Sequence, residues 1–269
     1  MAERPSWAPP EVDIDTPSIA RVYDYWIGGT HNFPVDRALA AKVTEVNPGL
    51  PATLRANRAF LRRAVRELSA LGVRQFLDIG SGIPAEGNVH DVALAAHPRS
   101  TVVYVDIDPV AVAHGRAILA DEPRATVFQG DLHKPAEILD APDLRRLIDF
   151  SRPVGLILAA VLHFVPDEDD PLGLVRQFTD RLVPGSHLVI SHAGADTVPR
   201  TAPEAAERYK GAVSQVIWRD PAELTALFEG YELLPPGVVR APLWQPEPGD
   251  RPDPELSMLA GVAVKPTVG

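Results

Sequence analysis

Residues 76–85 read FLDIGSGIPA, and this stretch decides the fold of the chain. An apolar strand runs into the pair Gly80-x-Gly82 and then into residues that favour a helix. Glycine lets the main chain turn sharply and lets a ligand approach where a Cβ atom would stand in the way. The stretch therefore predicts a strand, a tight turn and a helix, with a ligand site at the turn.

Strand-like and helix-like segments alternate on the carboxyl side of this turn. Helical patterns lie near residues 88–96, 110–120 and 172–183, between apolar runs of strand length. This alternation predicts an α/β fold with a doubly wound, Rossmann-like sheet of seven strands, mostly parallel and ending in an antiparallel edge. The predicted strands are Gln75–Ile79, Thr101–Val105, Thr126–Gln129, Val154–Ala160, His187–Ser191, Tyr231–Leu234 and Met258–Val264.

A helical extension of residues 16–72 precedes the sheet. Its first helix is expected to begin at Thr16 as N-cap, with Pro17 at the first helical position. Residues 1–15, rich in proline and polar residues, are expected to form a flexible arm, and residues 73–269 the sheet domain. The three helices of the extension are expected over residues 16–27, 34–46 and 52–71.

The composition is that of an ordinary globular protein. Of 269 residues 45% are apolar and none is cysteine, which excludes a disulfide scaffold, a cysteine-ligated zinc site and a cysteine nucleophile. The formal charge of −10 argues against nucleic acid or an anionic membrane as a partner. Arginine far outnumbers lysine, which we attribute to a GC-rich genome rather than to phosphate binding. No targeting signal or membrane span is expected, which predicts a cytoplasmic protein.

Three carboxylates lie at the ends of successive predicted strands. Asp78 stands two residues before the first glycine, and Asp106 ends the next strand. Asp131 follows the third strand. Because the carboxyl ends of parallel strands share one edge, these acids are expected to meet there, where an acid can accept hydrogen bonds from ribose hydroxyls. Taken singly, each acid could equally be a helix N-cap or part of a turn.

Two cofactors compete for this pattern. The segment Gly80-x-Gly82-x-x-Ala85 also fits the dinucleotide fingerprint, but Asp78 would place a negative charge close to the phosphates of NAD. S-adenosylmethionine has no phosphate, and a nearby carboxylate stabilises its ammonium and sulfonium charges. Asp78 therefore favours S-adenosylmethionine, with an NAD(P)-dependent oxidoreductase as the alternative.

At these residues the chain resembles the class I S-adenosylmethionine-dependent methyltransferases. The resemblance lies in LDIGSG at 77–82, VVYVDIDP at 102–109, FQGDL at 128–132 and GLILAAVLHFVPD at 155–167. A narrower resemblance is to an actinobacterial methyltransferase family long filed as a domain of unknown function, and it is carried by ARVYDYWIGGTHNFPVDR at 20–37 and RANRAFLRRAV at 55–65. The chain departs from the wider superfamily at the glycine turn, where Gly-Cys-Gly-x-Gly is commoner.

The resemblance implies that the carboxyl edge binds S-adenosylmethionine and releases S-adenosyl-L-homocysteine. Asp78 would then hold the methionine ammonium, Asp106 the ribose hydroxyls and Asp131 the adenine amino group. Ile107 and Leu132 would cover the adenine ring. The implied cofactor residues from the sheet are Asp78, Gly80, Ser81, Gly82, Asp106, Ile107, Asp131, Leu132, Ala160 and Val161.

The extension is expected to close over the sulfonium as a lid. Its implied cofactor residues are Tyr23, Asn32 and Phe33, because an aromatic face beside a cation is favourable. The alternative is that they only pack within the extension. Arg37 or Arg58 could pair with the methionine carboxylate, although a surface role is the more common one for arginine.

Catalysis of methyl transfer depends mainly on an in-line approach of the acceptor, and a base matters only if the acceptor must lose a proton. His163 is the candidate base, and a buried histidine bonded to the main chain is the alternative. No histidine has metal-ligand spacing, so no metal is expected. The leading hypothesis is a methyltransferase for a small-molecule acceptor. A non-catalytic S-adenosylmethionine-binding regulator is a further alternative, and neither the acceptor nor the oligomeric state can be inferred from the sequence.

Overall fold

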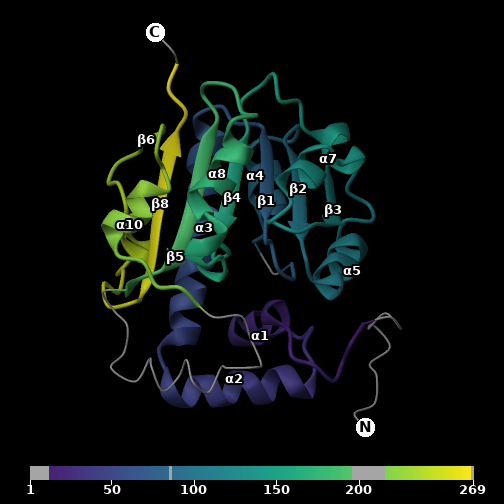
Figure 1. Ribbon diagram of the computed structural model, residues 1–269, viewed down its shortest axis with the longest axis vertical. Helices are drawn as coiled ribbons and strands as arrows, with labels where there is room; N and C mark the ends of the chain where they lie inside the picture. Colours follow the sequence, from purple (N-terminus) through teal and green to yellow (C-terminus); the bar gives the residue numbers. More distant parts are fainter. Residues whose placement is uncertain (1–11, 85–86, 196–215, 268–269) are drawn as a thin grey trace.

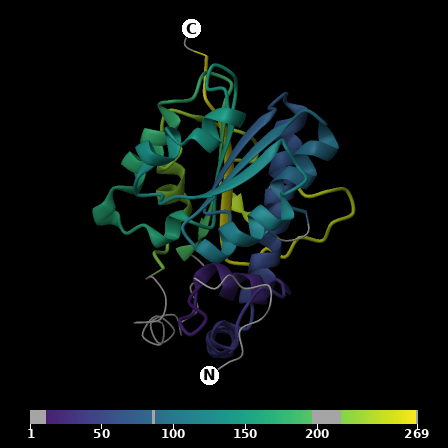
Figure 2. The same cartoon turned by 90° about the vertical axis from the view of Figure 1, so that its right-hand side faces the viewer.

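The computed structural model describes residues 12–84, 87–195 and 216–267. One central sheet has helices packed against both faces, which makes a three-layer α/β architecture (Figure 1, Figure 2). The strand order is β3-β2-β1-β4-β5-β8-β6, and β7 also pairs with β8. The strands are β1 (Gln75–Ile79), β2 (Thr101–Asp106), β3 (Ala125–Gln129), β4 (Gly155–Ala159), β5 (His187–Ala193), β6 (Glu232–Leu233), β7 (Val239–Arg240) and β8 (Met258–Val264).

The sheet confirms the predicted doubly wound arrangement. Strands β1 to β5 are parallel, and β8 is antiparallel to β5. The short strands β6 and β7 each pair antiparallel with β8. The strand that runs against the others is therefore β8, and β6 lies outside it at the end of the sheet. Within the described ranges the sheet has eight strands rather than the predicted seven. Pro235 and Pro236 follow β6, and because proline cannot donate to a strand ladder, the pairing stops there and resumes at Val239.

Helices precede, connect and follow these strands. None within the described ranges is long and apolar enough to cross a membrane. The α-helices are α1 (Ile19–Trp26), α2 (Pro34–Val46), α3 (Leu50–Ala70), α4 (Val89–Ala96), α5 (Pro109–Ile118), α6 (Pro135–Leu139), α7 (Pro142–Leu147), α8 (Pro171–Thr179) and α10 (Pro221–Ala226), and the short 3₁₀ helices are η1 (Leu162–Phe164), η2 (Asp167–Asp169) and η4 (Ala241–Leu243).

The first helix begins later than the sequence predicts. Its N-cap is Ser18 rather than Thr16. The main-chain N–H groups of Asp15 and Thr16 both donate to the carboxylate of Asp13, at 2.8 and 3.1 Å. Residues 13–16 therefore form a turn in which Thr16 is a member rather than the start of the helix.

Successive side chains of each strand point to opposite faces of the sheet, and this divides the core into two layers. In β1, Leu77 and Ile79 join the apolar cluster beneath α6, α7, α8 and α10, whereas Phe76 joins the cluster beneath α3, α4 and α5. Phe60 and Leu68 of α3 pack in that second cluster. The boundary predicted at residue 72 between extension and sheet domain therefore falls within one continuous core.

The extension lies across the carboxyl edge of the sheet. Helices α1 and α2 lie beyond the carboxyl ends of β1 and β4 in both views (Figure 1, Figure 2). The buried side chains of Val12 and Phe33 pack with Ile83, Val110 and Ala111, which lie beside the glycine turn and in α5. Val12 is thus part of the core rather than of a flexible arm, and residues 1–11 of the predicted arm lie outside the described residues.

One buried carboxylate holds the start of the extension together. Asp36 accepts hydrogen bonds from Arg21 Nε at 2.8 Å, from the N–H of Phe33 at 2.8 Å and from the N–H of Ser18 at 2.9 Å. Arg21 and Asp36 are both buried, so their charges attract in a medium of low polarity. Asp36 therefore ties the start of α1 to the start of α2.

A second carboxylate shapes the loop between these helices. Asp24 accepts hydrogen bonds from the N–H of His31 and from Asn32 Nδ2, both at 2.9 Å. A Cβ atom at Gly29 would lie 2.0 Å from Asp24 Oδ1, so only glycine fits there. The residues that carried the narrower resemblance are in large part those that build this loop.

Replacing Asp36 with alanine should lower the free energy of unfolding by about 3–5 kcal/mol, because Arg21 would remain buried without a counter-charge. Glu247→Ala is the matched control, since it removes an exposed ion pair with Arg66 and should cost about 1 kcal/mol or less. Urea denaturation followed by circular dichroism measures both values. Equal losses in the two variants would show that Asp36 does not anchor the extension.

Candidate cofactor site

The glycine turn after β1 is held by the neighbouring strand. The N–H groups of Gly80 and Ser81 donate to the carbonyl of Val105 at 2.8 and 3.2 Å. Gly80 has a φ of +73°, and a Cβ atom there would lie 2.5 Å from Val161 Cγ2. The end of β4 therefore packs directly against the turn, in a space that only glycine leaves open.

Asp106 connects the glycine turn after β1 to the end of β2, two features that the sequence suggested separately. Its Oδ2 accepts the N–H of Gly82 at 2.6 Å, and its Oδ1 accepts the N–H of Asp108 at 2.8 Å. Burial raises the pKa of Asp106 to about 6, although these main-chain hydrogen bonds oppose the shift. The Cβ position of Gly82, with a φ of +68°, has no atom within 4 Å. An acid and an open glycine turn thus adjoin at the carboxyl edge.

Ile107 follows Asp106, and its apolar side chain is 63% exposed. Its carbonyl accepts a hydrogen bond from Gln129 Nε2 at 3.0 Å, which fixes the main chain there. A buried acid followed by an exposed apolar side chain suits a ligand in which a sugar carries a flat ring.

Asp78 lies within β1, opposite Tyr104 of β2, and its side chain is 3% exposed. Among the described residues its carboxylate accepts no hydrogen bond. Burial raises its pKa to about 7; the positive charge of Arg58 opposes this shift and Asp106 adds to it. Asp78 is therefore neither an N-cap nor a turn residue. Hydrogen bonds from the described residues do not offset the free energy that burial of its carboxylate costs.

Arg58 brings α3, α1 and the glycine turn together. Its guanidinium lies 5.6 Å from the centre of the Tyr23 ring and donates through Nη2 to the carbonyl of Ile83 at 3.3 Å. Its Nε is buried and has no acceptor among the residues that the structure describes. The Tyr23 hydroxyl in turn accepts a hydrogen bond from Asn57 Nδ2 at 3.2 Å. The positive charge of Arg58 also acts on the carboxylate of Asp78.

Three other residues singled out in the extension have structural contacts. Asn32 bonds through Nδ2 to Asp24 and accepts a hydrogen bond from Arg37 Nη1 at 3.0 Å. Phe33 is buried in the cluster with Ile83, and the Arg21 guanidinium lies 5.0 Å from the centre of its ring. Asn32, Phe33 and Arg37 therefore build the loop, whereas Tyr23 lies next to Arg58.

The remaining predicted residues of the sheet lie at the same edge. Partial burial alone would raise the pKa of Asp131, but hydrogen bonds from the main chain and side chain of His133 outweigh it, and the pKa is lowered. Leu132 is buried in the apolar core, which is the structural alternative to covering a ring. Ala160 has a φ of +57°, a left-handed conformation that is uncommon outside glycine and clusters at functional sites.

His163 is 7% exposed and lies beside a second buried histidine. Its ring centre is 5.6 Å from that of His192, and its Nδ1 is buried and has no hydrogen-bond partner within the described part of the chain. His192 Nε2 accepts a hydrogen bond from Arg219 Nη1 at 2.7 Å, and Arg219 also binds Asp167. Burial, with the positive charge of Arg219 and the proximity of His192, lowers the pKa of His163 well below its ordinary value. His163 is therefore neutral at physiological pH, as a base must be, but weakly basic.

Sequence reasoning missed Arg219 and did not place Asp167 at the site. Neither belongs to a local motif, and the signal that would have found them is spatial: both lie on segments that cross the carboxyl ends of β4 and β5. The sequence also suggests the segment from Gly194 to Trp218, which contains Tyr209 and Trp218, as the one that shapes the acceptor pocket; Tyr209 lies outside the described residues.

The geometry agrees with comparisons to known proteins. The profile of a family described as S-adenosyl methyltransferase matches residues 5–266. The chain belongs to this S-adenosyl methyltransferase family. Its cofactor is accordingly S-adenosylmethionine, which decides between the two cofactors that the glycine turn allowed.

Solved structures support the assignment. A DUF574 family protein from Streptomyces avermitilis is 40% identical, with 94% of this chain and 99% of that chain covered and a TM-score of 0.89. A candidate methyltransferase from Thermobifida fusca is also 40% identical, with 98% and 100% covered and a TM-score of 0.91. The plantazolicin methyltransferase BamL, 10% identical over 92% of this chain and 96% of that one, shares the fold with a TM-score of 0.55. None of the curated proteins searched matches the sequence.

Asp78→Asn should change how stability depends on pH. The native carboxyl keeps its proton up to about pH 7, whereas the ordinary value of 3.8 applies after unfolding. Native protein therefore binds the extra proton between these values, and the contribution of Asp78 to stability falls as pH rises through them. The melting temperature of the variant, relative to that of the wild type, should rise by several degrees from pH 5 to pH 8. The exposed acid Asp121 supplies the control Asp121→Asn, which should show no such trend. A constant difference for Asp78→Asn would mean that Asp78 ionises normally.

Proposed function

We propose that this methyltransferase transfers the methyl group of S-adenosylmethionine to a small-molecule acceptor bound at the carboxyl edge. The observation that carries the site assignment is the junction of Gly82 with Asp106, next to a buried Asp78 whose carboxylate accepts no hydrogen bond within the described residues. When bound, the cofactor supplies an electrophilic methyl group on a sulfonium. The residues of the chain supply binding, orientation and exclusion of water.

Asp106 and Ile107 suit the adenosine end of the cofactor. The Asp106 carboxylate is already oriented by two main-chain N–H groups, and its remaining lone pairs can accept from ribose hydroxyls. The exposed side chain of Ile107 offers an apolar surface to the adenine. Binding would bury that side chain and so remove apolar surface from water. We also propose that Asp131, at the same edge of the sheet, accepts a hydrogen bond from the adenine amino group and that Leu132 covers the adenine ring.

Asp78 and Arg58 suit the two charges at the methionine end. A ligand ammonium beside Asp78 would provide the positive charge that favours the ionised carboxyl. The buried Nε of Arg58, which has no acceptor in the described ranges, would donate to the ligand carboxylate. The glycine turn between them, formed by Gly80, Ser81 and Gly82, lets the ligand approach the main chain. Val161 packs against Gly80 at the end of β4 and would confine the same end of the ligand, next to Ala160.

The extension acts as a lid in this proposal. Helix α1 already lies across the carboxyl edge, and Tyr23 lies against Arg58. Closure would keep water from the sulfonium and strengthen its attraction to the Tyr23 ring. Asn32 and Phe33 contribute indirectly, because they hold the loop that follows α1 in place.

The acceptor is proposed to meet the cofactor near His163. A neutral His163 can take a proton from an acceptor. The neighbouring ring of His192 is held in place by its hydrogen bond with Arg219. The charge of −10 favours a small-molecule acceptor over nucleic acid, and a cytoplasmic location is proposed with it. A structure of the same fold, that of BamL, contains a desmethylPZN analog together with S-adenosylhomocysteine.

Asp106→Ala should weaken binding of S-adenosylhomocysteine by about 1.5–3 kcal/mol, because charge-assisted hydrogen bonds to the ribose are lost. Isothermal titration calorimetry measures the affinity, and a thermal melt shows that the variant is folded. Asp121→Ala, which removes an exposed acid, should bind as tightly as the wild type. An unchanged affinity for the folded Asp106 variant would contradict the ribose assignment.

Turnover separates an enzyme from a cofactor-binding regulator. We expect S-adenosylhomocysteine to form from S-adenosylmethionine when a panel of small phenols, amines and carboxylic acids is supplied, and this rate should fall in Asp106→Ala at subsaturating cofactor. Tight cofactor binding with no product from any acceptor would favour the regulator.

Hydrogen exchange tests the lid. Main-chain amides of residues 19–33 should exchange more slowly once S-adenosylhomocysteine is added, because closure reduces local opening. Amides of β8, which is already buried, serve as the internal reference. Equal exchange of residues 19–33 with and without the ligand would rule out closure.

A further inference from the structure

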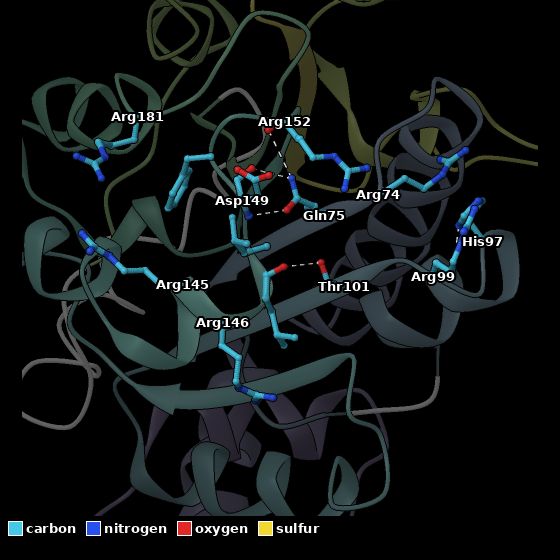
Figure 3. Close-up of a pocket in the computed structure, with 13 residues that line it drawn as sticks. Arg74, Gln75, His97, Arg99, Thr101, Arg145, Arg146, Asp149, Arg152 and Arg181 are labelled. Atoms are coloured by element: carbon cyan, nitrogen blue, oxygen red, sulfur yellow. Dashed lines mark hydrogen bonds between the residues drawn. The ribbon is translucent and has the colours of Figure 1, made fainter.

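A hollow of about 950 Å³ lies at the amino edge of the sheet, the end opposite to the cofactor site (Figure 3). We call it the arginine hollow. Among the described residues that line it, Asp149 is the one acid, in a protein whose formal charge is −10. Its basic lining residues are Arg74, Arg99, Arg145, Arg146, Arg152 and Arg181, with His97 beside them. Arginines have thus gathered at one hollow of an acidic molecule.

These arginines come from separate parts of the chain and surround the hollow. Arg74 directly precedes β1, Arg99 precedes β2 and Arg152 precedes β4. Arg146 lies in α7 and Arg181 follows α8. Figure 3 shows the six arginines placed around Gln75, Asp149 and Thr101. The arginines therefore approach the hollow from several segments of the chain rather than along one helix or strand.

The floor of the hollow is held by internal hydrogen bonds. Gln75 Oε1 accepts the N–H of Asp149 at 2.7 Å, and Gln75 Nε2 donates to the carbonyl of Asp149 at 3.0 Å. Thr101 Oγ1 donates to the carbonyl of Leu147 at 2.9 Å. The loop that carries Arg152 is therefore tied to the starts of β1 and β2. Little ordering of this loop would be needed on binding.

Three guanidinium groups remain available to a ligand. Arg145 pairs with Asp140, Arg74 donates to main-chain carbonyls, and the Arg181 guanidinium lies 5.8 Å from the centre of the Phe150 ring. Within the described residues, no carboxylate forms an ion pair with the remaining three. These exposed side chains are Arg99, Arg146 and Arg152.

The field of the arginines affects a neighbouring group. Desolvation, together with the positive charges of Arg74 and Arg99, lowers the pKa of His97. The carboxylate of Asp149 accepts hydrogen bonds from the N–H and the hydroxyl of Ser151, and the positive charge of Arg152 also acts on it. One carboxylate does not balance six arginines. The hollow therefore keeps an excess of positive charge.

We propose that the arginine hollow binds a small ligand that carries two or more phosphate groups. A guanidinium group can donate two parallel N–H hydrogen bonds to the oxygens of one phosphate. Several arginines around one hollow therefore suit a ligand with a short chain of phosphates better than a ligand with one carboxylate. The volume lies in the range of small-molecule sites. A long polyanion such as RNA would extend beyond the hollow onto a surface with more than ten excess negative charges, which would repel it. Inorganic polyphosphate and nucleoside polyphosphates share this chemistry.

Calorimetry on the full-length protein at low salt tests the proposal with inorganic tripolyphosphate and with ATP. The double variant Arg146→Ala/Arg152→Ala should bind tripolyphosphate at least about tenfold more weakly, because two charge-assisted contacts are lost. Arg251→Ala is the matched control, since it removes an exposed arginine on the loop before β8, at the carboxyl edge, and should bind like the wild type. Affinity for S-adenosylhomocysteine should be unchanged in both variants, which shows that they are folded and separates this result from any failure at the cofactor site.

Each outcome decides the matter. Tighter binding of ATP than of tripolyphosphate would support a nucleotide, and equal binding would support recognition of the phosphate chain alone. Absence of tripolyphosphate and ATP binding to the wild type, or equal binding by the wild type and the double variant, would overturn the proposal. Preferential binding of a 20-nucleotide single-stranded RNA, lost in the double variant, would overturn it in favour of nucleic acid. If the double variant is unfolded, the charge reversal Arg146→Glu replaces it, with the same expected loss.

Discussion

The hydrogen bond from the N–H of Gly82 to the carboxylate of Asp106 is the interaction on which the carboxyl edge depends. It joins the turn after β1 to the end of β2, and the Val105 carbonyl secures the same turn through two further N–H groups. Once the turn is in place, Gly80 lies against Val161 at the end of β4. Three strands that are separate in the sequence thus contribute one surface, because parallel strands end at a common edge.

The buried acids of this protein fall into two kinds. Asp24 and Asp36 accept several hydrogen bonds each, and these bonds offset the loss of hydration on burial. Asp78 has only the nearby charge of Arg58 to oppose its desolvation, which is why its pKa rises to about 7. The first kind stabilises the extension, whereas Asp78 costs stability at a place where a cationic ligand end would recover it. Such a cost is typical of functional sites.

The two edges of the sheet differ in charge. Asp78, Asp106 and Asp131 gather at the carboxyl edge, while the arginine hollow occupies the amino edge. Both groupings follow from the parallel direction of the strands. The loops that precede the strands meet at the amino edge, and the loops that follow them meet at the carboxyl edge. A cationic cofactor and a polyphosphate ligand would therefore occupy opposite ends of one core without competing for the same groups.

The sequence by itself determined the sheet and its cofactor motif. Alternating apolar strands and amphipathic helices specified a doubly wound fold, and the glycine turn with Asp78 and Asp106 favoured a cationic cofactor over NAD, because these signals are local in the chain. The exact start of α1 was wrong, since the turn made by Asp13 competes with the N-cap signal of Thr16. The split of the edge strand into β6 and β7 was likewise not foreseen.

Only the tertiary structure decided which residues face one another. In the sequence, Arg58 and Arg37 were equal candidates to pair with the methionine carboxylate. In the structure Arg58 contacts Tyr23 and the carbonyl of Ile83, and its positive charge acts on Asp78. Arg37 instead donates to Asn32 in the loop of the extension. The contact of His192 with Arg219 and the gathering of arginines around one hollow were invisible for the same reason. Such groups meet through strand order and helix packing rather than through spacing along the chain.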